Sequence, residues 1–341
     1  MNVKISKYNP AKLPPDPPSL EAASSAVRHV AVTAADAGMR VDRFLAAQLP
    51  GTPYTFLHRL MRTGQVRVNS GRVQGGVRLA AGDSVRLPPV RLALPQERTH
   101  PPDSWVRGMR ERIVWRDGEL LVLNKAAGMA VHGGSGDSWG AVDAMRRLFQ
   151  WEESPLRPEL CHRLDKETSG CLLFALTAPA LRQMAAAFRA GTVEKEYWAL
   201  VRGHPQPAAG VIDLPLLKGT VRAGERMVVS ADRGLAARTR YQVISRFAHA
   251  SLVQVWLESG RTHQIRVHFQ SIGHPLAGDQ KYGDPAFDGQ MRTMGLRRLF
   301  LHARRLAFPH PVTGEQVTVE TPLDAALQQV LQNLENSATQ K

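Results

Sequence analysis

The chain has 341 residues, and its 44 lysines and arginines outnumber its 30 aspartates and glutamates, which gives a formal net charge of +14. Such a surplus indicates a polyanionic partner. The length favours two domains, and a hydrophobic content of 43% favours a globular chain over a disordered one. The apolar stretches are far shorter than the roughly 20 residues of a membrane-spanning helix, so we expect no membrane span.

Residues 1–28 are rich in Pro, Ser and Ala without hydrophobic periodicity, and we expect a flexible tail there. Prolines follow the first lysines where a secretory signal has its apolar segment, so a cytoplasmic location is expected. The two cysteines, Cys161 and Cys171, cannot build a disulfide framework, and they lack the CxxC spacing of a zinc site. We expect both to be small buried residues and expect no metal.

Half of the charge surplus lies between Arg40 and Arg91. This segment has nine arginines, two acidic residues and no lysine. A solvated charged face is the ordinary explanation of a charge run, but so few acids favour a surface that faces phosphates. The residues expected to contact RNA are Arg43, His58, Arg59, Arg62 and Arg67.

Two helices and two strands are predicted within this basic segment. Apolar residues recur at helical spacing over 41–49 and 56–61, and strand-like alternation follows over 66–69 and 83–87. The layout resembles the small RNA-binding domain first described in bacterial ribosomal protein S-four, over residues 38–90. We therefore expect a small N-terminal α+β RNA-binding domain.

A second domain is expected over residues 109–330, after a Pro-containing linker at 91–108 and before a C-terminal tail at 331–341. Asp117-Gly118 predicts a hairpin between two apolar runs. Further strands are expected at 197–201, 239–243 and 252–257, and helices at 141–149, 180–188 and 262–271. Because no regular βαβ rhythm is present, we expect an α+β fold with a mixed, mainly antiparallel sheet.

Two familiar catalytic patterns fail in the second domain. The segment 132–137 ends in Asp where a GxSxG nucleophile elbow needs Gly, and it lacks the Gly-Lys-Ser/Thr ending of a phosphate-binding loop. His162 to Asp165 is superficially similar to a kinase catalytic loop but has Leu and Asp in the wrong order. Nucleotide-driven phosphoryl transfer is therefore not expected.

A dense polar cluster, residues 162–170, runs directly into an apolar strand. A carboxylate placed there between cations suits a catalytic cleft, but a hydrogen-bonded turn would explain the same residues. The cluster matches the HRLDxxTSG signature of the pseudouridine synthase family that includes ribosomal large-subunit enzymes. Residues 120–125, 195–203 and 261–268 are similar to three further segments of that family in order and spacing.

The resemblance implies an enzyme that isomerises uridines of large-subunit ribosomal RNA to pseudouridine without a cofactor. Asp165 is expected to be the essential nucleophile or base, with attack on the ribose or on the uracil both open. Arg261 is expected to keep it ionised, and Tyr197 to stack on the flipped base and to take part in proton abstraction. Arg163 is expected to enter the space that the base leaves, and Ile265 to pack on the uracil.

Two other functions stay open from the sequence. One is a pseudouridine synthase that acts on transfer RNA, and the other is a non-catalytic RNA-binding factor of ribosome assembly, which the arginine-rich segment alone would explain. The target uridines do not follow from the residues. We expect a monomer.

Overall fold

The computed structural model describes residues 27–339, apart from residues 35, 50, 51, 53, 90–99, 134–138, 223, 224, 231 and 232. The chain divides into two compact units, residues 1–98 (unit 1) and residues 99–341 (unit 2). Among the described helices, none is long and apolar enough to cross a membrane. The tail expected at residues 1–28 lies almost wholly outside the described residues.

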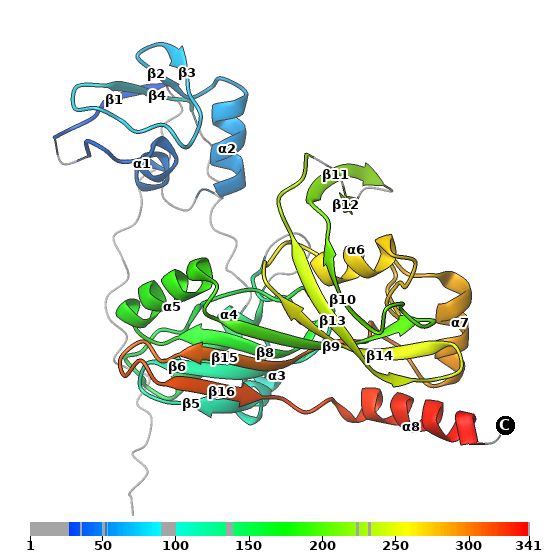
Figure 1. Cartoon of the computed structure of the whole chain (residues 1–341). Helices are drawn as coiled ribbons and strands as arrows, with labels where there is room; N and C mark the ends of the chain where they lie inside the picture. Colours follow the sequence, from blue (N-terminus) through cyan, green and yellow to red (C-terminus); the bar gives the residue numbers. More distant parts are fainter. Residues whose placement is uncertain are drawn as a thin grey trace, which may run out of the picture. The chain divides into compact units, whose positions relative to one another are not determined.

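Unit 1 packs two short helices on a small antiparallel sheet (Figure 1). Helices α1 (Val41–Gln48) and α2 (Tyr54–Arg62) share one hydrophobic core with the sheet, built around Phe44, Leu57 and Val85. The strand order is β1 (Arg28–Ala31), β4 (Ser84–Leu87), β2 (Arg67–Val68) and β3 (Gly71–Arg72). The predicted helices and strands are confirmed. The sequence analysis did not predict β1, which lies before residues 38–90, because its four residues are too few to show a hydrophobic period.

Unit 2 is built on a ten-stranded mixed sheet. Its main path runs β10-β13-β14-β9-β15-β8-β6-β5, with β16 on β15 and β7 on β8. The strands are β5 (Ile113–Arg116), β6 (Leu120–Lys125), β7 (Glu159–Leu160), β8 (Ser169–Ala175), β9 (Glu194–Arg202), β10 (Ala209–Asp213), β13 (Arg238–Arg246), β14 (Ala250–Leu257), β15 (Leu301–Pro309) and β16 (Gln316–Glu320). A separate hairpin joins β11 (Leu216–Arg222) to β12 (Glu225–Ser230). Only the β8–β15 pairing is parallel among the described strands, which confirms the predicted mixed, mainly antiparallel sheet.

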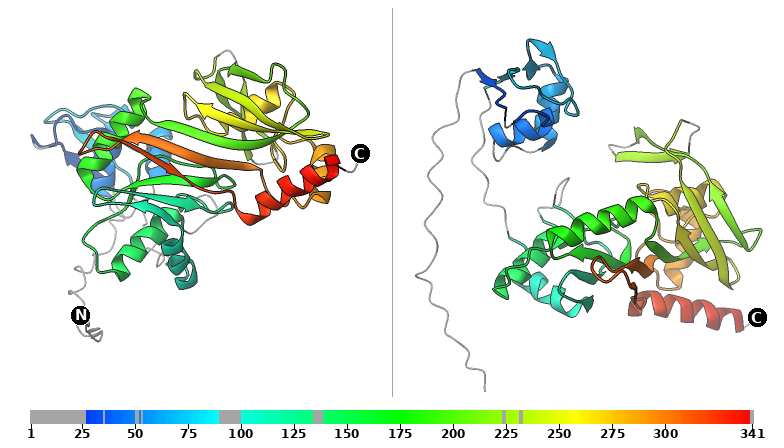
Figure 2. Two further views of the ribbon diagram at one scale, coloured as in Figure 1. Left: turned by 60° about the horizontal axis from the view of Figure 1, so that its bottom comes forward. Right: turned by 60° about the vertical axis from the view of Figure 1, so that its left-hand side comes forward.

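Six helices of the described chain belong to unit 2. They are α3 (Asp103–Glu111), α4 (Ala141–Trp151), α5 (Ala178–Ala190), α6 (Gln264–Ser271), α7 (Pro285–Thr293) and α8 (Ala325–Thr339). Helices α3 and α4 lie side by side, as Figure 2 shows, and α5 packs against β8. The predicted helices are confirmed as α4, α5 and α6; α5 ends at Gly191, which takes the left-handed conformation of a helix stop.

The linker and the C-terminal tail that the sequence predicts are partly helical in the structure. Helix α3 occupies the second half of the linker predicted at 91–108, because Val106 and Met109 bury an apolar face against the core. The prolines that precede this helix are compatible with a helix start as well as with a linker. Helix α8 likewise continues to Thr339 through the tail predicted at 331–341, since Leu334 is buried.

The parallel pairing of β8 with β15 depends on Gly170. Its φ is +108°, and a Cβ there would lie 2.2 Å from the carbonyl oxygen of Ala303. Backbone strain of this kind costs about 1–3 kcal/mol and overpacking adds about 1–3 kcal/mol. We expect Gly170→Ala to lower the free energy of unfolding in urea by about 3 kcal/mol, whereas Gly118→Ala, which meets open space, serves as the control. Equal losses in the two variants would contradict the steric argument.

Candidate active site

A cavity of about 390 Å³ in unit 2 brings together the site residues that were expected in this domain. They come from three segments that are distant in the sequence: the loop between β7 and β8, strand β9, and the chain around the start of α6. The lining includes Arg163, Asp165, Tyr197, Arg261 and Ile265. Folding therefore places residues 162–165 and Thr168 of the polar cluster along a cleft.

Lys125, at the end of β6, holds the backbone of the loop that carries Asp165. Lys125 is fully buried, and its Nζ donates to the carbonyl oxygens of Ala126, Met129 and Lys166 at 2.8 to 2.9 Å. Three acceptors match the three N–H donors of an ammonium group. One of the three belongs to the residue that follows Asp165, so the lysine fixes the backbone of the loop.

Two buried cations interact with the charge of Asp165. Burial lowers the pKa of Lys125 to about 7, while the charges of Glu167 and Asp165 act to raise it. Burial also acts to lower the pKa of Arg266, but the hydrogen bonds and charge of Asp279, together with the charge of Asp165, raise it overall. Asp165 thus lies in the field of Lys125 and Arg266.

Arg266 is held rigidly by Asp279. Its Nε and Nη2 donate to the two carboxylate oxygens at 2.7 and 2.6 Å, and both side chains are buried. The guanidinium carbon also lies 5.0 Å from the ring centroid of Tyr282. A bidentate pair with a stacked ring fixes both the position and the plane of the guanidinium.

Tyr197 and Ile265 give the cavity its apolar surface. Tyr197 on β9 and Ile265 in the first turn of α6 are both almost fully buried. Burial, helped by the charge of Asp165, raises the pKa of Tyr197. The phenol therefore stays protonated at neutral pH and presents a neutral ring beside the carboxylate.

Residues 119–271 match the model of the family described as RNA pseudouridylate synthase. Ribosomal large subunit pseudouridine synthase C of Pasteurella multocida is 44% identical over 317 residues, which cover 90% of this chain and 94% of that protein. The protein of the same description from Escherichia coli strain K12 is 45% identical over 319 residues, which cover 91% and 98%. The chain belongs to the RNA pseudouridylate synthase family.

Solved structures agree with this membership. The human RNA Pseudouridylate Synthase Domain Containing 4 structure is 29% identical, has a TM-score of 0.57, and covers 68% of this chain and 96% of its own. The human Domain Containing 1 structure is 28% identical with a TM-score of 0.52, covering 65% and 94%. The resemblance expected from the sequence motifs is therefore confirmed, and the chain is an isomerase of uridine in RNA.

In this pseudouridine synthase Arg261 lines the same cavity as Asp165, and its expected role of keeping Asp165 ionised stays a prediction. It is exposed, its Nε donates to the carbonyl oxygen of Ala236 at 3.2 Å, and it forms no ion pair with Asp165 within the described part of the chain. Arg266 is the arginine whose pKa responds to Asp165. Both arginines belong to the motif Arg-Thr-His-Gln-Ile-Arg and line the cavity, and Arg266, within α6, is the buried one.

Lys195 lines the cavity although the sequence analysis did not single it out. Burial lowers the pKa of Lys195, and no carboxylate pairs with it among the described residues. The signal was present in the sequence: Lys195 precedes Tyr197 by two positions in a strand, and such residues share a face. The synthase therefore offers an unpaired ammonium group beside its tyrosine.

His263 is a second lining residue that sequence reasoning missed. Its Nδ1 lies 2.8 Å from the hydroxyl of Tyr282, and this hydroxyl accepts from the backbone N–H of Val228 at 2.9 Å. The contact with Tyr282 fixes the orientation of the imidazole ring, with Nδ1 facing the phenol. Its left-handed backbone, with φ of +54°, places the residue at the very start of α6.

The synthase should lose stability in mild acid because of two buried histidines. Burial lowers the pKa of both His162 and His302 to about 4, below about 6.5 in an unfolded chain. Between these values the unfolded chain binds more protons, so stability falls as the pH falls from about 6.5 towards about 4. At pH 5 each histidine should cost about 2 kcal/mol relative to pH 7. Urea unfolding at both pH values measures this, and His302→Gln should remove its share; an unchanged pH difference in that variant would contradict it.

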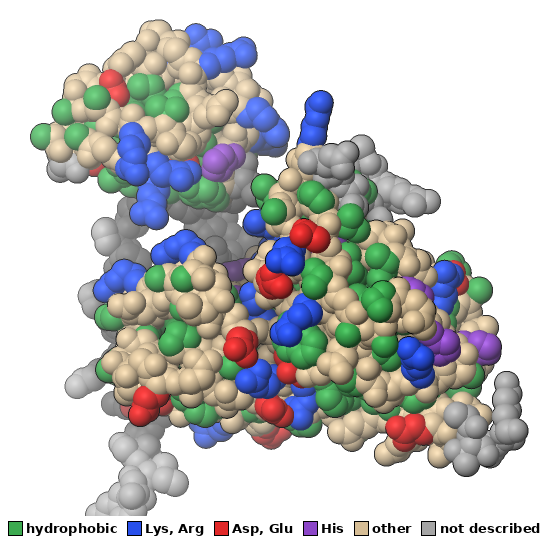
Figure 3. Space-filling model, viewed as in Figure 1, with side chains coloured by type: hydrophobic (Ala, Val, Ile, Leu, Met, Phe, Trp, Pro, Cys, Tyr) green, Lys and Arg blue, Asp and Glu red, His purple; other side chains and the backbone are tan. Residues whose placement is uncertain are grey.

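The residues expected to bind RNA in unit 1 lie on several elements. His58, Arg59 and Arg62 of α2 line a hollow of about 690 Å³ that Arg72 also lines. Arg67 lines a second hollow, and Arg43 is exposed on α1. Figure 3 shows groups of Lys and Arg side chains on the face of unit 1 that is in view.

Most partners of the arginines in unit 1 are backbone carbonyls and not carboxylates. Arg67, Arg78 and Arg86 donate to the carbonyl oxygens of Gly64, Gly38 and Gln65. Within the described part of unit 1, one arginine–carboxylate pair occurs, between Arg40 and the buried Asp42. The arginine charges therefore remain uncompensated and suit contact with a polyanion.

No group of three or more His, Cys, Asp or Glu side chains suited to hold a metal occurs among the described residues. Cys171 is buried as expected, whereas Cys161 is only partly buried. Burial raises the pKa of Cys161 to about 12 and that of Cys171 to about 11, so both remain thiols at neutral pH.

Proposed function

We propose that this chain isomerises uridines of large-subunit ribosomal RNA to pseudouridine in the cytoplasm. The observation that carries the proposal is the meeting of Asp165, Tyr197 and Ile265 in one cavity of a pseudouridine synthase. Relatives described as ribosomal large subunit pseudouridine synthase C match nearly the full chain at about 45% identity, which supports the choice of RNA.

The proposed reaction is redox-neutral. The bond between ribose C1′ and uracil N1 breaks, C1′ bonds to C5, the proton on C5 leaves, and N1 gains a proton, so no cofactor is needed. Asp165 acts as an anionic nucleophile or base, a role that suits a carboxylate because its ordinary pKa is near 3.9. In our proposal Arg261, which lines the same cavity, keeps its expected role beside Asp165, and Arg266 adds positive charge from a fixed position.

The apolar surface of the cavity would receive the base after it has left its stack. Flipping costs a few kcal/mol, and stacking on an aromatic ring returns about 1–3 kcal/mol. Tyr197 supplies that ring and Ile265 an opposing contact, while the exposed Arg163 fills the gap left in the RNA. Because the pKa of Tyr197 is raised, we propose stacking as its main role and not proton abstraction.

The function is tested by release of tritium from RNA that carries tritium at C5 of uridine. The purified chain should release tritium from large-subunit ribosomal RNA and not from transfer RNA. Release from transfer RNA alone would overturn the proposed substrate. Absence of release from both, with RNA binding intact, would support the non-catalytic alternative.

We propose that unit 1, with its S-four-like segment of residues 38–90, docks RNA without taking part in the chemistry. Arg59→Gln combined with Arg62→Gln should weaken RNA binding and lower the slope of log affinity against log salt by roughly 0.7–0.9 for each phosphate that is no longer neutralised. The single-turnover rate at saturating RNA should not change. A binding slope equal to that of the parent protein would contradict a docking role for this face of α2.

A further inference from the structure

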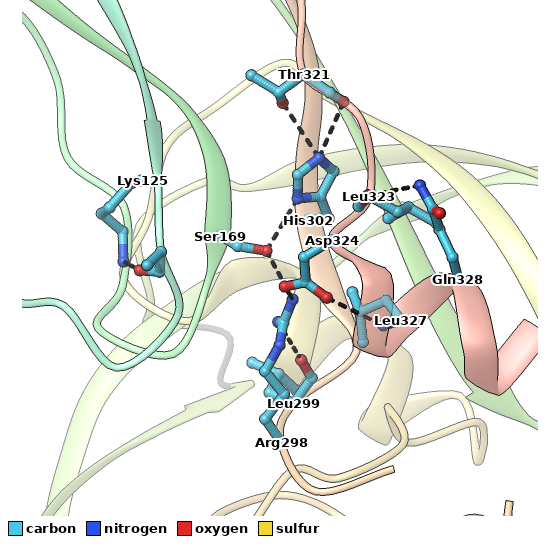
Figure 4. Close-up of polar contacts among 11 residues, drawn as sticks. Lys125, Ser169, Arg298, Leu299, His302, Thr321, Leu323, Asp324, Leu327 and Gln328 are labelled. Carbon is cyan, nitrogen blue, oxygen red and sulfur yellow. Dashed lines mark hydrogen bonds and ion pairs between the residues drawn. The ribbon is translucent and has the colours of Figure 1, made fainter. Parts of the chain in front are cut away.

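A polar cluster, buried at Ser169, His302 and Thr321 and exposed at Asp324, joins the loop of Asp165 to helix α8 (Figure 4). Ser169 begins β8 four positions after Asp165, and His302 lies opposite it on β15. The cluster consists of Ser169, Arg298, His302, Thr321 and Asp324, and we name it the relay cluster. The proposed reaction uses none of these side chains directly.

The hydrogen bonds of His302 determine the orientation of the Ser169 hydroxyl. Nε2 of His302 lies 3.1 Å from the carbonyl oxygen of Thr321, which can only accept, so Nε2 carries the ring proton. Nδ1 therefore accepts the proton of the Ser169 hydroxyl at 2.9 Å. Burial keeps the imidazole neutral, and Ser169, His302 and Thr321 are all buried. The hydroxyl of Ser169 thus donates its one proton to Nδ1 of His302.

Arg298 donates a second hydrogen bond to the Ser169 hydroxyl. Its Nη2 donates to Ser169 Oγ at 3.1 Å and to Asp324 Oδ2 at 2.5 Å. Asp324 Oδ1 accepts the backbone N–H of Leu327 at 3.0 Å and so caps the first turn of α8. One guanidinium nitrogen therefore touches both the strand that follows the Asp165 loop and the start of the C-terminal helix.

We propose that Arg298 is a positioning residue that couples the N-terminus of α8 to the loop that carries Asp165. The inference rests on the proposed function. Loss of Arg298 would leave the Ser169 hydroxyl with His302 as its partner and would remove the link from Ser169 to α8, while Lys125 would still hold the backbone of the loop. A displacement of about 1 Å of a catalytic group can lower a rate by about 100-fold. Asp165 is then well placed only when α8 is docked, because Arg298 connects α8 to the loop of Asp165.

Arg298→Met tests the coupling, with Arg297→Met as the matched control. Arg297 is adjacent and exposed, and it donates to the backbone of Arg292 without reaching the relay cluster. We expect Arg298→Met to lower the single-turnover rate at saturating RNA by about 10- to 100-fold, with RNA affinity within about twofold. The control should keep the parental rate. A parental rate in folded Arg298→Met would overturn the inference, even if its thermal midpoint falls.

Asp324→Asn supplies a second variant in case Arg298→Met does not fold. Asparagine keeps a side-chain oxygen for the cap of α8 and loses the ion pair with Arg298. The rate should fall here too, and the double variant should lose less than the product of the two single losses because both act through one contact. A loss of rate in the double variant equal to the product of the two single losses would overturn the coupling.

Hydrogen exchange over residues 163–169 separates this inference from the proposed function. The measurement needs no substrate, and Arg298→Met should exchange faster in this loop than Arg297→Met. Equal exchange would overturn the positioning role. If the parent protein releases no tritium but the loop of Arg298→Met still exchanges faster than that of Arg297→Met, the proposed function is overturned and the coupling stands.

Discussion

Asp165→Asn should lower the single-turnover rate of tritium release by a factor of at least about 100. A positioned acid or base contributes about 10²- to 10⁴-fold, and a nucleophile contributes more. The amide has nearly the same shape as the carboxylate but has no negative charge for the field of Lys125 and Arg266. RNA affinity should change little, because this single side chain adds little to the docking charge.

Glu167→Gln is the matched control for Asp165→Asn. It makes the same change of group two positions away on the same loop, at an exposed residue that does not line the cavity. Tritium release by this variant should stay close to that of the parent protein. Equal rates for Asp165→Asn and the parent would remove Asp165 from the reaction.

Arg266→Gln should lower the free energy of unfolding by about 3–5 kcal/mol. The substitution leaves Asp279, whose side chain is fully buried, without its bidentate partner, and an uncompensated buried charge carries a cost of this size. The pKa of Asp279, now held below its ordinary range by Arg266 against the effect of burial, should rise in the variant. The loss in stability should therefore shrink as the pH falls and Asp279 takes up a proton. Urea unfolding at pH 7 and pH 5 measures both effects.

A double variant separates the structural from the catalytic contribution of Arg266. Arg266→Gln with Asp279→Asn replaces the ion pair by two neutral amides that can bond to each other, and much of the stability should return. Activity should not return in full, since the positive charge of Arg266 is then missing from the field around Asp165. Recovery of the parental rate in the double variant would show that Arg266 acts through folding alone.

Elements with local signals were predictable from the sequence, and those without were not. Asp117-Gly118 marked the hairpin of β5 and β6, and Gly191 marked the end of α5. Strand β1 has four residues, too few to show a hydrophobic period. The prolines before α3 indicated a linker where the structure has a helix. Local spacing thus finds elements that carry their own start and stop residues.

The site was predictable only to the level of its motifs. The signature 162–170 located Asp165, but the sequence analysis did not single out Arg266, whose burial depends on where α6 begins. His263 is oriented by Tyr282, a residue of a different segment. The hydrogen bonds of Ser169 in the relay cluster join residues 129 and 133 positions apart, and no spacing rule reaches that far.

The carbonyl contacts of the arginines in unit 1 have a consequence for the RNA docking that we propose for this unit. A cation that no carboxylate holds can meet a phosphate without first breaking an ion pair, so every RNA backbone is an equally good partner. Such binding permits hopping and sliding along a strand and raises the effective concentration of uridines near the cavity. In that proposal, discrimination among uridines rests on unit 2, whereas unit 1 sets how fast candidate uridines are sampled and how strongly salt slows the search.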